Sequence, residues 1–144
     1  MNSRAAALWA QTKLHVWPER YWLVSLPLEA WSEATGLAAG CAKEFAALVR
    51  ERDEASLTIE ESAWQASGLR RLARAEAGPY RAVSLDVEID LDVTGYLAPA
   101  AARLAEANVS IVPQCAYLKD HLLIHEEQLA LAEQVLEQLI RECR

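Results

Sequence analysis

The spacing of apolar residues changes three times between Tyr80 and Ile140, in an order that describes one folding unit. Apolar and polar residues first alternate, as in a strand with one buried face. The spacing then becomes every third or fourth residue, as in an amphipathic helix, and two short apolar runs and a second helical stretch follow. The predicted elements are a strand at 83–91, a helix at 97–108, strands at 109–112 and 117–124, and a helix at 129–140.

This order favours a split βαβ, ferredoxin-like arrangement, in which an antiparallel sheet carries its helices on one face. We therefore predict an α+β protein. The polar residues that alternate along 83–91 agree with a sheet whose other face is open to solvent or to a partner.

The first half of the chain repeats this order of elements without repeating its residues. The predicted elements are a helix at 2–14 with Ser3 as its N-cap, strands at 21–26, 45–52 and 55–60, and a helix at 61–76 broken at Gly68. The conformation of 29–40 stays open. Gly78 and Pro79 mark a boundary. We predict a helical extension at 1–17, a first, degenerate unit at 18–78 and a second unit at 79–144.

The charge and hydropathy of the chain argue against two kinds of partner. Its 21 acidic and 14 basic residues give a net charge of −7, which repels phosphate backbones, so we expect no nucleic acid partner. No segment reaches the roughly 20 apolar residues that a membrane-spanning helix needs, and the N-terminus lacks the apolar core of a secretion signal. We expect no membrane partner and a cytoplasmic protein.

The cysteines and histidines indicate neither a metal site nor a catalytic site. The three cysteines, odd in number and widely spaced, are predicted to be free thiols. His121 and His125 lie four residues apart on a predicted strand, about 13 Å by the strand rise, which is too far to share a metal ion. Cys115 and His121 are the residue types of a nucleophile and a base, but no third orienting residue accompanies them. We expect no cofactor.

Two features leave alternatives open. All five tryptophans lie in the first half of the chain, where they can form a core of large rings or an exposed aromatic surface for a partner. Pro113 interrupts an apolar run and cannot donate a hydrogen bond to a neighbouring strand, which predicts an edge strand or a bulge.

Three segments of the second half resemble the ACT domain. They are DVTGYLA at 92–98, LAEANVSI at 104–111 and YLKDHLLI at 117–124. More closely, the chain resembles the small tandem ACT-like proteins related to the CASTOR-type amino-acid sensors. The first half fits through its strand at Tyr21, through Glu44-Phe45 and through 58–61, so the resemblance extends from about Trp17 to Leu139.

The resemblance implies a non-catalytic regulatory module that binds an amino acid or a similar metabolite at the interface between ACT units. It also implies a homodimer, because ACT-like units commonly pair along their edges. The ligand-binding residues that it implies are Thr94, Gly95, Ile111, Val112, Tyr117 and Asp120.

The chemistry of these positions suits an amino acid. Backbone N–H groups at the Thr94-Gly95 turn precede a helix and can bind a carboxylate, and the absence of a Cβ on Gly95 allows close approach. Asp120 can bind an ammonium group through charge-assisted hydrogen bonds. Ile111 and Val112 would contribute backbone contacts and an apolar wall.

Each of these residues also has a simpler interpretation. Thr94 and Gly95 can be an ordinary helix start, and Asp120 can form an ion pair with the adjacent Lys119. A protein-interaction or assembly module without a ligand is therefore the alternative to a sensor, and an enzyme is third.

Overall fold

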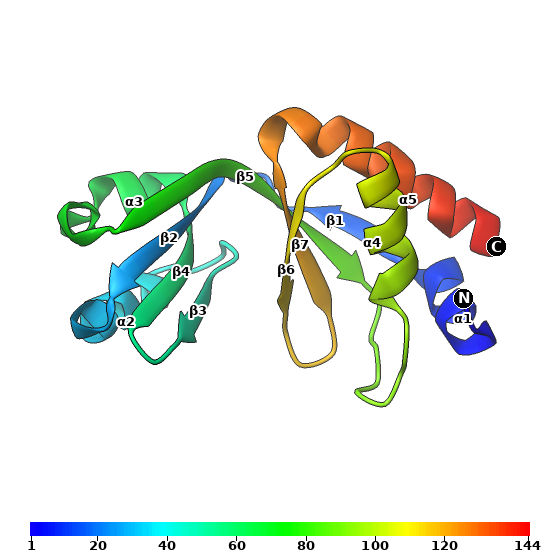
Figure 1. Cartoon of the computed structure of the whole chain (residues 1–144), viewed down its shortest axis with the longest axis horizontal. Coiled ribbons are helices and arrows are strands. Elements are labelled where there is room, and N and C mark those ends of the chain that lie inside the picture. The colour runs from blue at the N-terminus through cyan, green and yellow to red at the C-terminus, as the bar shows by residue number, and fades with distance from the viewer. The chain divides into compact units, whose positions relative to one another are not determined.

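The computed structural model describes all 144 residues, and the chain divides into two compact units. One of them, the continuous unit, is Trp17–Arg81. The other, the split unit, combines Met1–Val16 with Ala82–Arg144. The long strand β5 (Ala75–Asp86) contributes its first residues to the continuous unit and its last residues to the split unit (Figure 1).

The continuous unit is a βαββαβ arrangement. Its elements, with η for a 3-10 helix, are β2 (Tyr21–Pro27), η1 (Leu28–Ala30), α2 (Trp31–Ala39), β3 (Ala47–Arg50), β4 (Glu54–Glu60), α3 (Glu61–Ala66), η2 (Gly68–Leu72) and the first part of β5. The strands lie in the order β3–β4–β2–β5, and each neighbouring pair is antiparallel. This is the strand order of a ferredoxin-like sheet.

One face of this sheet carries the core of the continuous unit. Alternate residues of β2 and β4, including Leu26, Leu57 and Ile59, are fully buried there against α2 and against Trp64 of α3. The segment 29–40, whose conformation the sequence left open, is therefore mostly helical, because Ala34 packs into this core.

The split unit is a second sheet with helices. Its elements are α1 (Ser3–Gln11), β1 (Lys13–Val16), the last part of β5, α4 (Leu97–Glu106), β6 (Ile111–Cys115), β7 (Asp120–His125), η3 (Glu126–Gln128) and α5 (Leu129–Cys143). The strands lie in the order β1–β5–β7–β6. The pairs β1–β5 and β6–β7 are antiparallel.

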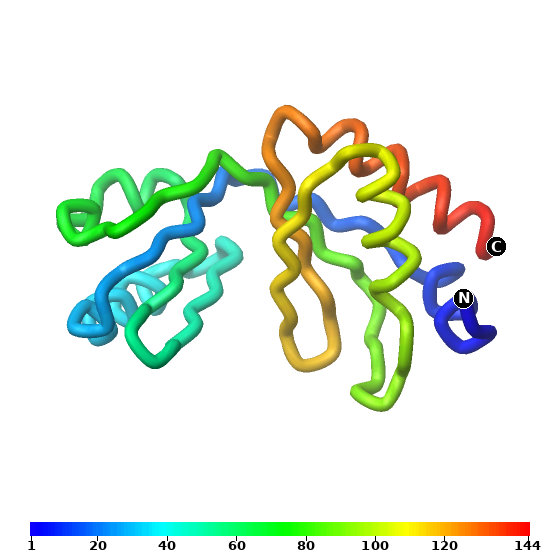
Figure 2. The backbone as a smooth tube through the Cα atoms, viewed as in Figure 1, coloured from blue at the N-terminus to red at the C-terminus, as the bar shows by residue number.

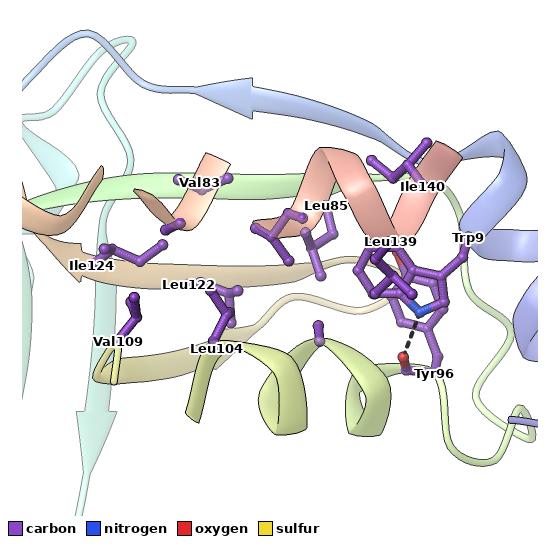
Figure 3. Packing of buried hydrophobic residues seen from close by; sticks show 13 residues of the cluster. Trp9, Val83, Leu85, Tyr96, Leu104, Val109, Leu122, Ile124, Leu139 and Ile140 are labelled. Carbon is purple, nitrogen blue, oxygen red and sulfur yellow. Dashed lines mark hydrogen bonds between the residues drawn. The ribbon is translucent and has the colours of Figure 1, made fainter. Parts of the chain in front are cut away.

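The core of the split unit lies between this sheet and the three α-helices (Figure 3). Val83 and Leu85 of β5 and Leu122 and Ile124 of β7 supply its strand side. Leu104, Leu136 and Leu139 are among the residues that α4 and α5 supply at helical spacing. Trp9 of α1 is fully buried in the same cluster, and α1 packs beside α5.

The predicted fold class is confirmed, because the chain is an α+β protein with ferredoxin-like sheets that carry helices on one face. The structure revises the details at the N-terminus. The predicted helical extension at 1–17 contains a helix that ends at Gln11 and a strand, β1, that forms one edge of the sheet in the split unit. The N-cap of α1 is Asn2 rather than Ser3, because the Asn2 side chain accepts the hydrogen bond from the Ala5 N–H.

Two further differences concern β5. The predicted boundary at Gly78 and Pro79 lies inside this strand, and the contacts of the chain divide between Arg81 and Ala82 instead. The strand ends at Asp86, five residues before the predicted end at Leu91. Val87 and Ile89 continue the apolar alternation because they still pack against the core after the chain has left the sheet.

Two further findings concern the cysteines and the length and composition of the helices. All three cysteines are free thiols, as the sequence predicts. None of the helices combines the length and the apolar composition that crossing a bilayer requires.

Candidate ligand-binding site

A cavity of about 360 Å³ lies entirely within the split unit, between the loop 87–96 and the turn 116–119 that joins β6 to β7. Figure 2 shows the loop, in light green, and the turn, in gold, at the same end of the unit. The residues that line the cavity are 89–91, 93, 95–98 and 115–120. A hydrogen bond from the Ile89 N–H to the Leu118 carbonyl, with an N–O distance of 2.9 Å, connects the two walls.

The loop 87–96 is held by side chains from the N-terminus. The Arg4 guanidinium donates hydrogen bonds to the carboxylates of Asp90 and Asp92, at 3.1 to 3.2 Å. These contacts lower the pKa of Asp92, chiefly through the hydrogen bond from Arg4. The Asn2 side-chain amide donates to the Thr94 carbonyl at 2.9 Å, while its oxygen caps α1. Asn2 therefore connects the start of α1 to the loop that precedes α4.

Tyr96 anchors the end of the loop. Its ring is stacked on Trp9 with a centroid distance of 4.8 Å, and its carbonyl accepts a 2.7 Å hydrogen bond from the Trp9 indole N–H (Figure 3). Its hydroxyl and the Thr12 hydroxyl form a buried hydrogen bond at 2.8 Å. Burial raises the pKa of Tyr96 well above its ordinary value, and the charge of Asp120 adds to this rise, while the hydrogen bond with Thr12 opposes it. The phenol stays neutral at physiological pH.

The start of α4 lines the cavity with its first two residues, Leu97 and Ala98, and with the preceding Gly95 and Tyr96. No side chain caps this helix, so its first N–H groups and the positive end of its dipole are available to an anion. Gly95 has a φ of 76°, a backbone conformation that favours glycine.

The opposite wall carries two charged residues, Lys119 and Asp120. Cys115 and Asp120 are directly paired across β6 and β7. Hydrogen bonding to the Asp120 carboxylate, together with burial, raises the pKa of the Cys115 thiol. The simpler interpretation of the sequence pairs Lys119 with Asp120. In the structure, Lys119 instead forms its ion pair with Asp86 of β5.

The structure brings together three of the predicted ligand-binding residues. Gly95, Tyr117 and Asp120 line the cavity. Thr94 is adjacent to the lining, with its carbonyl bonded to Asn2. Ile111 and Val112 lie at the other end of β6, with Val112 three residues or roughly 10 Å along the strand from Cys115. These two residues contribute to the strand pairing and, in the case of Ile111, to the core.

Cys115 and His121 do not form a nucleophile and base pair. Cys115 is paired with Asp120 and His121 with Gln114, so the thiol and the imidazole point to opposite faces of the sheet. The His121 Nδ1 instead lies 2.7 Å from the hydroxyl of Ser84, and both side chains are buried. The polar residues of β5 predict a sheet face that is open to solvent or to a partner, and the burial of Ser84 shows that solvent does not reach this position. No group of three or more His, Cys, Asp or Glu side chains is placed to bind a metal ion.

Several residues of the site could not be identified from the sequence. Leu91 and Tyr96 line the cavity, and Arg4 holds its loop through residues more than 80 positions away. The sequence predicts Cys115 to be a free thiol but does not indicate that it lies opposite Asp120 in the sheet. The one local signal was the sequence Asp90-Leu91-Asp92, where an apolar residue lies between two acidic ones in a loop.

Comparisons with known proteins agree with this fold. Residues 77–138 match the family model of the ACT domain, so an ACT domain is supported for the segment that forms the cavity. No protein of curated function matches the sequence.

Solved structures of similar fold cover most of the chain. A Vibrio cholerae protein of unknown function, described as a possible transport protein, has a TM-score of 0.72 at 23% identity and covers 96% of each chain. The structure of aspartokinase alpha and beta subunits has a TM-score of 0.68 at 17% identity, covering 90% of this chain and 98% of that one. The regulatory subunit of aspartate kinase from Thermus flavus has a TM-score of 0.64 at 14% identity, covering 88% and 95%. At these identities the likeness shows the fold alone.

Proposed function

We propose that the protein is a non-catalytic regulatory module that binds an amino acid in the cavity between the loop 87–96 and the β6–β7 turn. The observation that carries this proposal is the pairing, across one cavity, of an uncapped helix start at α4 with the carboxylate of Asp120. The match of 77–138 to the ACT domain supports it, as does the similar fold of a regulatory subunit of aspartate kinase.

The two ends of the cavity complement the two charges of an amino acid. The ligand carboxylate would accept hydrogen bonds from N–H groups of Tyr96 and Leu97, where the helix dipole favours a negative charge. The ligand ammonium would donate to Asp120, because the ion pair of the neighbouring Lys119 is formed with Asp86. An ammonium group would then replace or join the Cys115 thiol as a donor to this carboxylate.

Regulation would follow from the position of the ligand between two separate segments. A ligand that contacts both the loop 87–96 and the β6–β7 turn favours the arrangement in which they are held together. A partner protein that recognises this arrangement would be regulated by the same coupling free energy. Regulation of this kind requires no catalytic residue in the loop 87–96 or in the β6–β7 turn.

The assembly and compartment of the protein are part of the proposal. We propose a homodimer in the cytoplasm, in which β6, an edge strand of the split unit that contains Pro113, faces a second copy. The free thiols fit a reducing compartment. Light scattering coupled to size-exclusion chromatography measures the mass directly, and a monomer at micromolar concentration would contradict the dimer.

The proposal is tested by thermal unfolding with each of the twenty amino acids. A ligand at a hundred times its dissociation constant stabilises the folded state by about 2.7 kcal/mol, which raises the melting temperature by several degrees. Asp120→Asn should abolish this rise. Asp53→Asn, the same change at an exposed position of the continuous unit, should leave it intact.

Two outcomes would contradict the proposal. If no amino acid raises the melting temperature, an interaction module without a ligand becomes the better account. If the rise is unaffected in Asp120→Asn, the ligand binds elsewhere.

A further inference from the structure

We propose that the cavity selects an amino acid with an apolar, uncharged side chain. This inference rests on the proposed function and specifies the class of ligand. It comes from the residues of the cavity that the carboxylate and ammonium groups of the ligand would not use.

The two most exposed large apolar side chains of the protein both lie on this cavity. Leu91, in the loop 87–96, is 73% exposed, and Tyr117, in the β6–β7 turn, is 76% exposed. They come from the two opposite walls and are separated by 26 positions in the sequence. Because exposed apolar side chains that gather at one place mark binding sites, we assign them to the contact with the ligand side chain.

The rest of the lining is also mainly apolar. Ile89, Val93, Leu97 and Leu118 contribute to the walls, and none of them carries a polar side-chain atom. A ligand side chain that extends from Asp120 toward the rim of the cavity, formed by Leu91 and Tyr117, would meet these residues. Burying its methylene groups would strengthen binding.

No cation is available for an acidic side chain. Lys119 is the only basic residue that lines the cavity, and its ammonium is already paired with Asp86. Arg4, which holds the loop, is bonded to both Asp90 and Asp92. A side-chain carboxylate of aspartate or glutamate would therefore lose its hydration without gaining a partner.

A basic side chain is disfavoured for the complementary reason. The cavity has two carboxylates, Asp90 and Asp120. Asp120 is assigned to the α-ammonium, and the charge of Asp90 is already offset by Arg4. A second ammonium, as in lysine, would find no uncompensated carboxylate, while its methylene groups would gain only part of the apolar contact.

Calorimetric titration of the whole chain with a homologous series tests this inference. Alanine, 2-aminobutyrate, norvaline and norleucine differ by one methylene group each, and each added group should strengthen binding about fourfold. Aspartate, glutamate and lysine should bind at least roughly tenfold more weakly than norvaline. A flat series, or tighter binding of any of these charged amino acids than of norvaline, would overturn the inference while leaving amino-acid binding established.

Matched variants test whether Leu91 and Tyr117 contact the side chain of the ligand. Leu91→Ser and Tyr117→Ser should each weaken norleucine binding by roughly tenfold and change alanine binding little, because only the longer side chain reaches the rim. Both residues are exposed, so the variants should fold, which circular dichroism verifies. Val49→Ser is the control, because Val49 is also exposed, at 55%, but lies in the continuous unit. Equal weakening of alanine and norleucine would place the side chain of the ligand away from this rim.

A further variant tests whether the ion pair of Lys119 with Asp86 explains the exclusion of acidic side chains. Asp86→Asn removes the partner of Lys119 and should raise the affinity for glutamate severalfold, because the ammonium then becomes available to the ligand. An unchanged glutamate affinity would contradict the explanation for the exclusion of acidic side chains. If neither the homologous series nor the charged amino acids bind, the proposed function itself fails, which separates that result from a wrong class of ligand.

Discussion

The indole N–H of Trp9 donates a 2.7 Å hydrogen bond to the carbonyl oxygen of Tyr96, and the two rings are stacked on one another (Figure 3). Trp9 belongs to α1, near the N-terminus, and Tyr96 lies immediately before α4. The N-terminal helix therefore supports the residue from which the proposed ligand-binding helix begins.

Trp9→Phe should lower the free energy of unfolding by about 2–3 kcal/mol, because it leaves the buried Tyr96 carbonyl without its donor and opens a small cavity. Urea unfolding followed by circular dichroism measures the change. Trp31→Phe, at a partly buried tryptophan of the continuous unit, should cost less. Equal losses for the two variants would argue against a special role of the contact between Trp9 and Tyr96.

Asn2 has two separable roles, as N-cap of α1 and as donor to the Thr94 carbonyl. Asn2→Ala should destabilise the protein by about 1 kcal/mol through loss of the cap. Asn2→Asp should keep the cap and the stability, but it removes the donor to Thr94. Hydrogen exchange should therefore be faster in the loop 87–96 of Asn2→Asp, and unchanged exchange there would show that the Asn2 amide does not restrain the loop.

Two glycines with positive φ should respond differently to alanine. A Cβ at Gly78, where φ is 154°, would lie 2.9 Å from the Tyr21 carbonyl oxygen, so Gly78→Ala combines backbone strain with a clash and should cost more than about 2 kcal/mol. A Cβ at Gly95 would meet nothing closer than the Asn2 amide at 3.8 Å. Gly95→Ala should therefore cost only about 1 kcal/mol of strain. The reverse ranking in urea unfolding would contradict this.

His121 should make stability depend on pH. Burial lowers its pKa in the folded state below the ordinary value, against the smaller opposing effect of Asp120 and with a further lowering by Lys119. As the pH falls below about 6.5, the unfolded chain binds a proton that the folded chain resists, so stability decreases until the lower folded pKa is reached. The measurement is urea unfolding between pH 7.5 and 5. His121→Gln should have a smaller loss over this range, and an identical slope would assign the pH dependence to other groups.

The sequence was sufficient wherever burial follows a local period. The spacing of Leu97 to Leu104 predicted α4, and the alternation of Val83 and Leu85 predicted the part of β5 that faces the core. It could not locate the end of β5, because Val87 and Ile89 keep the alternating pattern while packing on the core outside the sheet. The strand β1 was missed because it has four residues and its partner in β5 lies about 70 positions later.

The same limit applies to the site. Gly95 and Asp120 have local signals, a glycine before a helix and an acidic residue that begins a strand, and both line the cavity. The ion pair between Lys119 and Asp86 joins residues 33 positions apart, so the sequence suggested the adjacent Asp120 instead. Ile111 and Val112 were placed by resemblance, and the length of β6 carries them away from the cavity.

The central claim is that an amino acid binds between the start of α4 and the β6–β7 turn. The most direct measurement is a titration of the isotopically labelled protein with leucine, followed by the chemical shifts of the backbone amides. The account predicts the largest shifts at Gly95, Tyr96, Leu97 and Ala98 and in the segment 115–120, with saturation, and their loss in Asp120→Asn. Saturable shifts confined to residues outside these two segments would contradict it.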